Sequence, residues 1–303
     1  MSLCGLVNVL KPPQMTSHDV VMRVRRFLRE KRIGHLGTLD PDAAGVLPVA
    51  VGQATRIVEF FAEQPKSYRG QLCLGVTTTS QDSTGQPLVV QQVPMLSREQ
   101  LHNALQAFTG PIEQMPPMVS AVSVQGKRLY EYARQGIEVE RAKRPVTIYE
   151  ITVVDFDEAA PETIVLDVIC SSGTYVRTLF HDIGQYLGCG AHMGWLIRTQ
   201  SGPFAIEEAL SLECLQEAGA SIQLLSMYDS LAHLEAVEVP LTRLSALQQG
   251  LSQYLPQSDW VEGQWVRFHR DQQLLALGQV SYQEKRWIGQ PRKVFHEGQN
   301  MPR

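Results

Sequence analysis

Residues 34–47 read GHLGTLDPDAAGVL, and this stretch restricts the local backbone more than any other part of the chain. Three glycines and a proline between two acids favour a tight turn, because glycine and Asp-Pro pairs are common at turns. One interpretation of Asp40 is therefore an ordinary solvated turn residue. The other is a reactive carboxylate on a close-packed loop, because the small residues around it allow a ligand to approach the backbone closely. His35 is near enough along the chain to face the same cleft.

The composition indicates a protein without membrane spans or disulfides. The 303 residues can form one large domain and a small one, and 44% hydrophobic with 19% charged residues is typical of globular proteins. No apolar run is long enough to span a membrane, and the start of the chain does not resemble a secretion signal. The five cysteines are scattered, which suggests neither a disulfide framework nor a zinc site. We expect a cytoplasmic protein with reduced thiols.

The net charge of −4 does not by itself point to a nucleic-acid partner, but the charge is unevenly distributed. Basic side chains outnumber acids in residues 1–32, and again in residues 126–145. A local basic surface can bind phosphates on an acidic protein, because salt screens charges beyond about 8 Å at physiological ionic strength. Ordinary solvated helix faces explain the same pattern, so the charge alone leaves both interpretations open.

Hydrophobic periodicity predicts a mixture of helices and strands. Residues 111–147 form a long excursion of the kind that is often a binding loop or lid. From about residue 236, short strand-like runs suggest a small separate β-rich module. The other predicted elements are an amphipathic helix over 18–32, an apolar segment leading into a helix over 46–64, a β-rich segment over 67–79, a capped helix over 97–110, and strands over 146–157 and from 163.

Two further motifs match the sequence signatures of phosphatases poorly. Asp40 and Asp42 resemble the DxD of phosphoaspartyl phosphatases, but the residues before them are glycine-rich rather than an apolar strand. CSSGTYVR at 170–177 has six residues between Cys170 and Arg177, whereas the loop of cysteine phosphatases needs five. The turn places Arg177 at the start of a helix, and there its guanidinium can bind a carboxylate or a phosphate. The alternative is an ordinary surface arginine.

Taken together, the motifs resemble those of the TruB-type tRNA pseudouridine synthases. GHLGTLDPDAAGVLPVAVGQATR closely matches the signature of this family. The other motifs follow in the family's order over residues 5 to about 210: LKPPQMTSHDV, KSYRGQLCLG, PPMVSAVSVQGKRLYEYARQG, SSGTYVRTL and LIRTQSGPF. The chain departs from the family pattern at four positions that affect loop detail: Gln14, Leu36, Ala44 and Thr79.

The resemblance implies an α+β pseudouridine synthase fold, with a mixed, mainly antiparallel sheet, flanking helices and a central cleft. It implies a catalytic domain over 1–235, with an RNA-binding, thumb-like insertion at about 111–147. A PUA-like RNA-binding domain would follow over 236–303. The implied reaction converts the uridine at position 55, in the T-loop of tRNA, to pseudouridine after base flipping.

The resemblance also implies the site residues. Asp40 matches the catalytic aspartate, Tyr68 the tyrosine that stacks on the target base, and Arg177 the arginine that pairs with the aspartate. Further expected substrate or RNA contacts are His35, Lys11, Leu196, Lys127, Arg128, Tyr130, Arg144 and Tyr175.

The expected partner is tRNA, bound through its T-arm and T-loop, by a monomer with no obligate protein partner, no cofactor, no metal and no membrane contact. Two alternatives stay open. One is a non-catalytic tRNA-binding and folding protein on the same scaffold. The other is an aspartyl-phosphate hydrolase that uses Asp40 and Asp42, for which the sequence offers no further acidic cluster.

Overall fold

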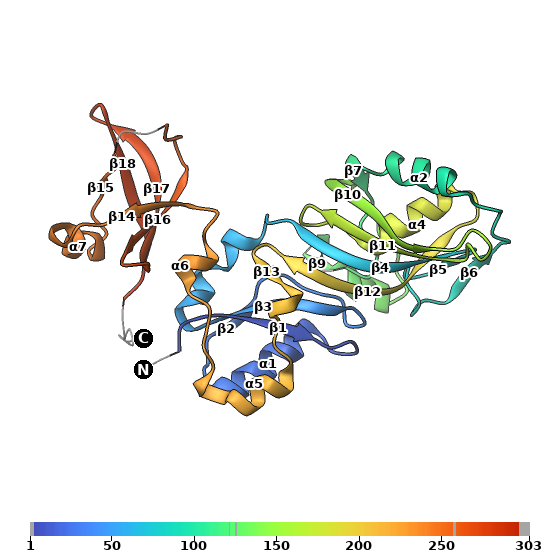
Figure 1. Ribbon diagram of the computed structural model, residues 1–303, viewed down its shortest axis with the longest axis horizontal. Coiled ribbons are helices and arrows are strands. Elements are labelled where there is room, and N and C mark those ends of the chain that lie inside the picture. Colours follow the sequence, from blue (N-terminus) through green and yellow to red (C-terminus); the bar gives the residue numbers. More distant parts are fainter. Residues whose placement is uncertain (1–2, 121, 125, 257–258, 297–303) are drawn as a thin grey trace.

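A nine-stranded sheet forms the centre of the protein in the computed structural model, which describes residues 3–296 except 121, 125, 257 and 258. The main strand order is β1-β3-β12-β4-β11-β10-β7, while β2 pairs with β3 and β13 with β12 (Figure 1). The strands are β1 Gly5–Lys11, β2 Ile33–His35, β3 Ala44–Val51, β4 Lys66–Leu74, β7 Gly110–Gln114, β10 Arg144–Phe156, β11 Thr163–Cys170, β12 Ala191–Ser201 and β13 Phe204–Ala205.

Two parts of the sheet meet where β12 lies beside β3. This is the one parallel pairing among the described strands of the large sheet, and it matches Ile197 to Ala44 and Arg198 to Gly45. A Cβ atom on Gly45 would lie 2.2 Å from the carbonyl oxygen of Arg198, and Gly45 has φ +110°. Only glycine fits this position without strain, so the motif that contains Asp40 leads directly into the junction.

Helices cover the two ends of the sheet on separate cores. α1 (Ser17–Leu28) and α5 (Leu212–Ala218) pack on the β1 end, through a cluster that includes Val20 and Val24. α2 (Arg98–Ala107) and α4 (Val176–Tyr186) cover the end formed by β4, β11 and β10 (Figure 1).

Two of the predicted helices have different bounds in the structure. The helix expected over 18–32 begins with a capping box at Thr16 but ends at Leu28, because Arg29 adopts a left-handed conformation with φ 52°. The segment expected to lead into a helix over 46–64 is the buried strand β3, followed by the 3₁₀ helix η1 (Gly52–Phe61). The capped helix expected over 97–110 is present as α2, with its cap at Ser97, but it ends at Ala107, and Gly110 begins β7.

The predicted excursion over 111–147 is partly sheet. Residues 110–114 form β7 and pair with the start of β10, so the chain leaves the sheet only between about 115 and 143. This shorter insertion contains β8 (Ser123–Val124), β9 (Lys127–Arg128) and α3 (Leu129–Arg134). A separate hairpin of β5 (Val76–Thr78) and β6 (Pro87–Val90) follows β4.

The C-terminal part of the chain forms a second, five-stranded sheet in the order β14-β16-β17-β18-β15. The predicted short strand-like runs are confirmed here, and the protein has the predicted α+β class. The strands are β14 Glu235–Glu238, β15 Gln253–Tyr254, β16 Trp265–Arg270, β17 Gln273–Gln283 and β18 Arg286–Val294, and the helix α7 Leu241–Gln248 follows β14 in the chain. Three short helices besides α5 precede this sheet: η2 Ile206–Glu208, η3 Gly219–Ser221 and α6 Met227–Ser230. No helix in the described ranges is long and apolar enough to cross a membrane.

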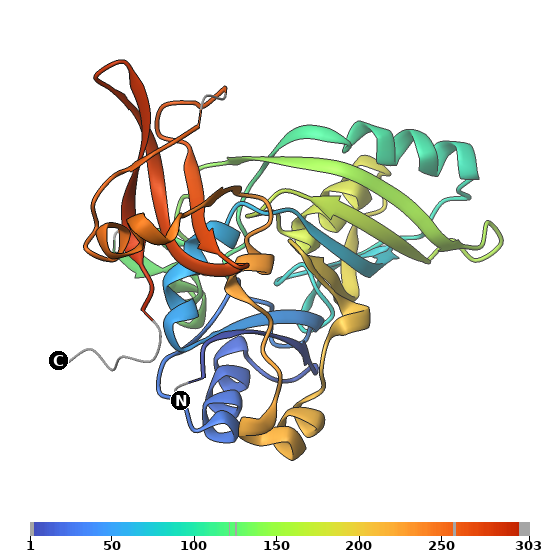
Figure 2. The ribbon, with the colours of Figure 1, turned by 60° about the vertical axis from the view of Figure 1, so that its left-hand side comes forward.

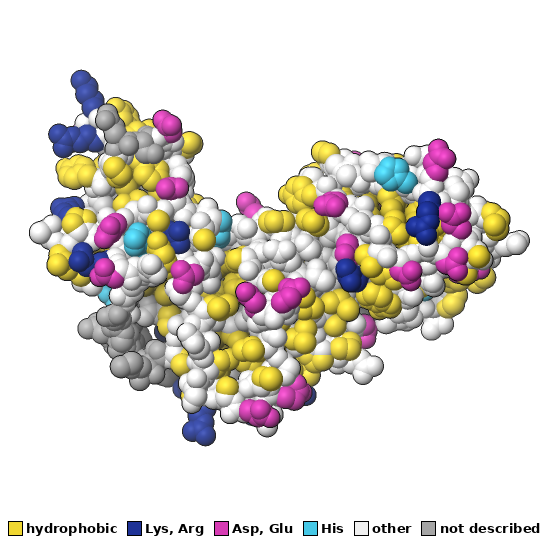
Figure 3. Space-filling view, viewed as in Figure 1, with side chains coloured by type: hydrophobic (Ala, Val, Ile, Leu, Met, Phe, Trp, Pro, Cys, Tyr) yellow, Lys and Arg dark blue, Asp and Glu magenta, His cyan; other side chains and the backbone are white. Residues whose placement is uncertain are grey.

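The second sheet packs on η1 of the first part (Figure 2). The Phe60 and Trp265 rings meet edge-on at 4.8 Å between centroids, and Arg56 Nη1 donates to the Val294 carbonyl at 2.7 Å. Lys293 pairs with Glu59 on the same helix. In the space-filling view, this sheet and the α2 end of the large sheet rise on either side of a broad hollow (Figure 3).

The junction at Gly45 generates a stability prediction. We expect Gly45→Ala to destabilise the protein by about 2 kcal/mol or more, because the new Cβ overlaps the β12 backbone and the left-handed backbone is strained. Thermal unfolding measures the loss. Gly263→Ala is the matched control, since Gly263 also has a positive φ (+81°) but open space around it. Equal losses in both variants would show that the packing at the junction is not tight.

Candidate active site

A cavity of about 380 Å³ opens at the β3–β12 junction. Its walls come from the loop before β3, from η1, from β4 and β12, and from the turn that leads into α4. The lining residues include Leu36, Gly37, Thr38, Leu39, Asp40, Val58, Ala62, Lys66, Tyr68, Ser120, Thr174, Tyr175, Arg177, Met193, Leu196 and Arg198.

Asp40 and Arg177 form an ion pair in this cavity. Arg177 Nη2 lies 2.5 Å from Asp40 Oδ2, and Arg177 Nη1 lies 3.5 Å from Asp82 Oδ2. The Arg177 side chain is only 5% exposed, whereas that of Asp40 is 42% exposed. The arginine therefore fixes the carboxylate from behind and leaves it open to the cavity.

Asp82 is held more tightly than Asp40. Its Oδ1 accepts hydrogen bonds from Ser80 Oγ (2.6 Å), Thr84 Oγ1 (2.6 Å) and the Thr84 backbone N–H (3.0 Å). Its other oxygen faces Arg177, so every polar atom of the carboxylate has a partner. Asp82 is thus a fixed anion that orients the guanidinium, while Asp40 retains accessible oxygens.

The loop that carries Asp40 is anchored on both sides. Ser17 Oγ bonds with both the N–H and the carbonyl of Leu39, at 2.9 and 3.1 Å. The N–H of Ala43 donates to the Asp40 carbonyl at 3.2 Å, which closes the turn. Leu39 and Ala43 are buried in the core of α2 and α4. This stretch is therefore an anchored turn that carries an accessible carboxylate.

Tyr68 lies in the middle of β4, directly opposite Arg198 of β12. Burial raises the pKa of the Tyr68 phenol, and the positive charge of the nearby Arg198 opposes this shift. The phenol is therefore neutral at physiological pH. Its half-buried ring packs against the apolar core on one side and lines the cavity on the other.

Two buried lysines support the cavity from beneath. Lys11 is fully buried, and its Nζ donates to the carbonyls of Pro12, Pro41 and Ala43 at 2.7–2.9 Å. Lys66 Nζ donates to carbonyls at the end of η1, including that of Ala62 at 3.0 Å. Burial lowers the pKa of each lysine to about 8. Lys11 was predicted as an RNA contact, but its buried ammonium holds the Asp40 loop, so we do not propose direct contact with RNA.

Three other predicted contacts lie in or beside the cavity. Leu196 and Tyr175 line it, and the backbone of Tyr175 is held by the Gln114 amide. His35 is in β2, next to the lining residue Leu36. Burial lowers the pKa of His35, and no described group pairs with its buried Nδ1, so the imidazole is neutral at physiological pH.

The remaining predicted contacts belong to the insertion and its base. Lys127 is exposed and lies 6.0 Å from the centroid of the Tyr132 ring. Arg144 is exposed at the start of β10, where it pairs with Gln114. The side chains of Arg128 and Tyr130 lie outside the part of the chain that the structure describes.

Sequence reasoning missed three residues that the structure places at the site: Asp82, Lys66 and Arg198. The family pattern often has an acid at the position of Thr79, and Asp82, three residues later, was not considered in its place. Lys66 and Arg198 stand inside two of the recognised motifs, KSYRGQLCLG and LIRTQSGPF, and this position was the available signal. Among the described residues, no group of three or more His, Cys, Asp or Glu side chains is placed to hold a metal ion.

Comparison with known proteins assigns the chain to a family. Residues 25–176 match the model described as TruB family pseudouridylate synthase (N terminal domain), and residues 177–237 match the tRNA pseudouridylate synthase B C-terminal domain. The chain is 59% identical to a tRNA pseudouridine synthase B of Heliobacterium modesticaldum, over 97% of this chain and 96% of that protein. It is 57% identical to one of Heliobacterium mobile, over 96% and 94%.

Solved structures show the same fold. An H/ACA RNP bound to a substrate RNA containing 2′-deoxyuridine includes a chain that is 26% identical, with a TM-score of 0.74 over 96% of this chain and 85% of that one. A chain of a Cbf5-Nop10-Gar1 complex is 28% identical, with the same TM-score and coverage. The predicted pseudouridine synthase fold is thereby confirmed, and the chain belongs to the TruB family of pseudouridylate synthases.

Proposed function

We propose that the protein converts a uridine in the T-loop of tRNA, at position 55, to pseudouridine, with Asp40 as the reactive carboxylate. The observation that carries the proposal is the position of Asp40: its carboxylate is held by a buried arginine yet stays accessible in the cavity. The relatives' names support tRNA as the substrate. The finer assignment to the T-loop uridine rests on the sequence resemblance.

The reaction breaks the N1–C1′ bond of the uridine, rotates the base and forms a C5–C1′ bond. The proton on C5 is lost and N1 gains one, so no electrons are transferred to or from another molecule. An ionised Asp40 serves either of two routes: attack on C1′, or removal of a proton from C2′. The guanidinium of Arg177, at hydrogen-bond distance from Asp40, holds the carboxylate in place for either route.

The cavity offers a place for a base that has left its stack. Unstacking costs roughly a few kcal/mol, and an aromatic contact returns about 1–3 kcal/mol per base. Tyr68 supplies the ring, and Leu196 supplies an apolar wall. Ser120 Oγ is buried and has no hydrogen-bond partner among the described residues. A bound uracil, with its carbonyl oxygens and N3–H, would satisfy this hydroxyl.

RNA contacts outside the cavity would come from three regions. His35 lies where it could occupy the space that the flipped base leaves. Lys127, Arg128, Tyr130 and Arg144 of the insertion and its base, with Tyr175 beside the cavity, would contact the T-arm, mainly through phosphates and shape.

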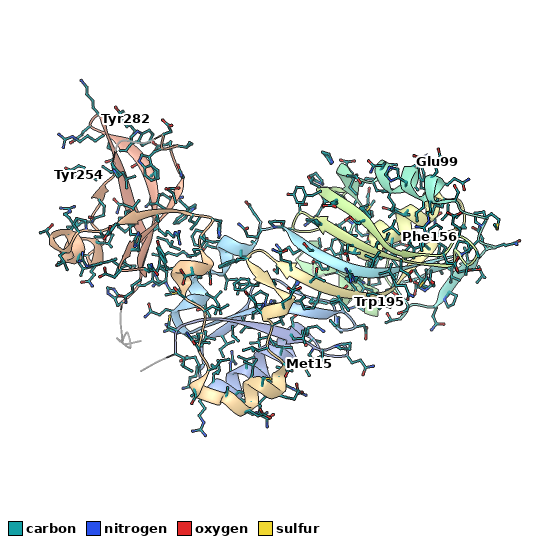
Figure 4. The ribbon with its side chains drawn as sticks, viewed as in Figure 1. Met15, Glu99, Phe156, Trp195, Tyr254 and Tyr282 are labelled. Atoms are coloured by element: carbon teal, nitrogen blue, oxygen red, sulfur yellow. The ribbon has the colours of Figure 1, made fainter. Side chains whose placement is uncertain are left out.

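The third region is the C-terminal sheet, which we propose to be the PUA-like RNA-binding domain of residues 236–303, after a catalytic domain of 1–235. Tyr254 and Tyr282 are 67% and 55% exposed on this sheet, close to Lys285 and Arg286 (Figure 4). Exposed aromatic rings beside cations are suited to stacking on unpaired bases. We further propose that the enzyme works in the cytoplasm as a monomer, without an obligate protein partner.

A protein that only binds and folds tRNA is the alternative. Binding to a polyanion does not require an accessible carboxylate, and Asp40 would repel phosphates. The geometry of Asp40 therefore favours catalysis, although a folding role could accompany it. The third hypothesis, an aspartyl-phosphate hydrolase that uses Asp40 and Asp42, finds no support. Among the described lining residues of the cavity Asp40 is the one acid, and the other charged residues are Lys66, Arg177 and Arg198.

The catalytic role of Asp40 predicts the outcome of a tritium-release experiment. Unmodified tRNA labelled at C5 of uridine should release tritium with the wild type. We expect Asp40→Asn to lower the rate at least about a thousandfold, equivalent to about 4 kcal/mol in the barrier, and to retain tRNA binding.

Asp42→Asn is the matched control for this experiment, because Asp42 is an exposed acid two residues away. It should keep a rate close to that of the wild type. Equal release by wild type and Asp40→Asn would remove Asp40 from the reaction. Tight tRNA binding by the wild type without any release would favour the binding and folding alternative.

A further inference from the structure

Arg198 is one of the largest fully buried side chains of the protein, with 1% of its surface exposed. It lies on β12, the strand between β3 and β4 in the sheet. Its backbone neighbours across the sheet are Gly45 on β3 and Tyr68 on β4. The side chain therefore sits between the strand that follows Asp40 and the tyrosine of the cavity.

The guanidinium joins separate parts of the site. Nε donates to the carbonyl of Val46 at 2.7 Å, which ties it to β3. Nη1 and Nη2 donate to the carbonyls of Thr38 and Gly37 at 3.2 and 3.3 Å, so the loop before Asp40 is held two residues from the carboxylate. Tyr68 is the residue directly opposite Arg198 in the pairing of β4 with β12, so the two side chains leave the same face of the sheet side by side.

A role in packing alone does not account for this cation. No carboxylate among the described residues pairs with Arg198, and its charge is balanced only by carbonyl dipoles. Burying an arginine in this way is costly, and an apolar side chain of similar volume would be cheaper. The positive charge also acts across the site. Burial is the main cause of the lowered pKa values of Lys11, His35 and Lys66, and the charge of Arg198 lowers them further. At Tyr68, whose pKa is raised by burial, the charge of Arg198 acts in the opposite direction.

We propose that Arg198 is a positioning residue of the isomerisation, which fixes the Asp40 loop and the Tyr68 phenol relative to each other. The inference rests on the function proposed above. The planar guanidinium connects these groups, because its three nitrogens donate to the carbonyls of Val46, Thr38 and Gly37. The same side chain lies beside Tyr68. The ammonium of a lysine is a single point donor and cannot span these groups.

The test compares Arg198→Lys with Arg69→Lys in the tritium-release assay. Arg69 lies next to Tyr68 on β4 and forms an exposed two-point pair with Asp167, with distances of 2.8 Å. We expect Arg198→Lys to lower kcat about 10- to 100-fold, because a misplaced reacting group costs rate, with the tRNA dissociation constant changed less than about threefold. Arg69→Lys should leave both close to the wild-type values.

A second measurement separates positioning from a general loss of structure. Both variants are studied at a temperature where circular dichroism shows them fully folded. Amide hydrogen exchange should increase in residues 36–43 of Arg198→Lys and stay unchanged in α1. Increased exchange throughout the protein would overturn the proposal, since Arg198 would then serve overall stability.

A double-mutant cycle with Tyr68→Phe tests the link to the phenol. If Arg198 acts partly through Tyr68, the combined variant should be less impaired than the product of the two single defects, by about tenfold. Multiplicative defects, or a wild-type kcat in Arg198→Lys, would overturn the inference. A wild type without synthase activity would instead refute the proposed function, so the two failures are distinguishable.

Discussion

The contact between Arg177 and Asp40 is the interaction on which the geometry of the site depends. It joins residues that are 137 positions apart in the sequence, and Asp82 adds a third segment to the same guanidinium. Arg177 can make these contacts because it is buried in the first turn of α4, where the core around Leu179 and Phe180 fixes the helix. The packing of α4 on the sheet therefore determines the position of Arg177, and with it the position of the Asp40 carboxylate.

Three buried cations near this pair have no carboxylate partner among the described residues. Lys11, Lys66 and Arg198 each direct their hydrogens at backbone carbonyls, so they stabilise the irregular segments on either side of the cavity. These segments lack the ladder hydrogen bonds of regular structure, and side-chain donors take their place. The same groups make the interior of the cavity positive, which suits a reaction that needs an ionised aspartate and a polyanionic substrate.

Much of this arrangement could be predicted from the sequence. The glycines around Asp40 indicated close packing, and the turn before Arg177 indicated a guanidinium at a helix start. The pairing of the two residues came from the family resemblance, because spacing along the chain gives no distances between remote segments. Asp82 and Arg198 were missed for a related reason: each is a single charged residue whose partners come from strands and loops far away in the sequence. The ends of α1 and of the insertion were misplaced, because a left-handed residue at Arg29 and a strand pairing at residues 110–114 leave little local signal.

The strand order also has a consequence for how the protein is made on the ribosome. β12 is synthesised long after β3 and β4, yet it lies between them in the sheet. Until β12 has been synthesised, β4 lacks its partner on that side, the start of β3 is unpaired there, and the cavity lacks its lining residues Met193, Leu196 and Arg198. The border between the two family-model regions, at residues 176 and 177, separates Asp40 and Tyr68 from Arg177 and Arg198. A nascent chain that ends at this border therefore carries Asp40 without Arg177, which pairs with its carboxylate, and without Arg198, which holds its loop.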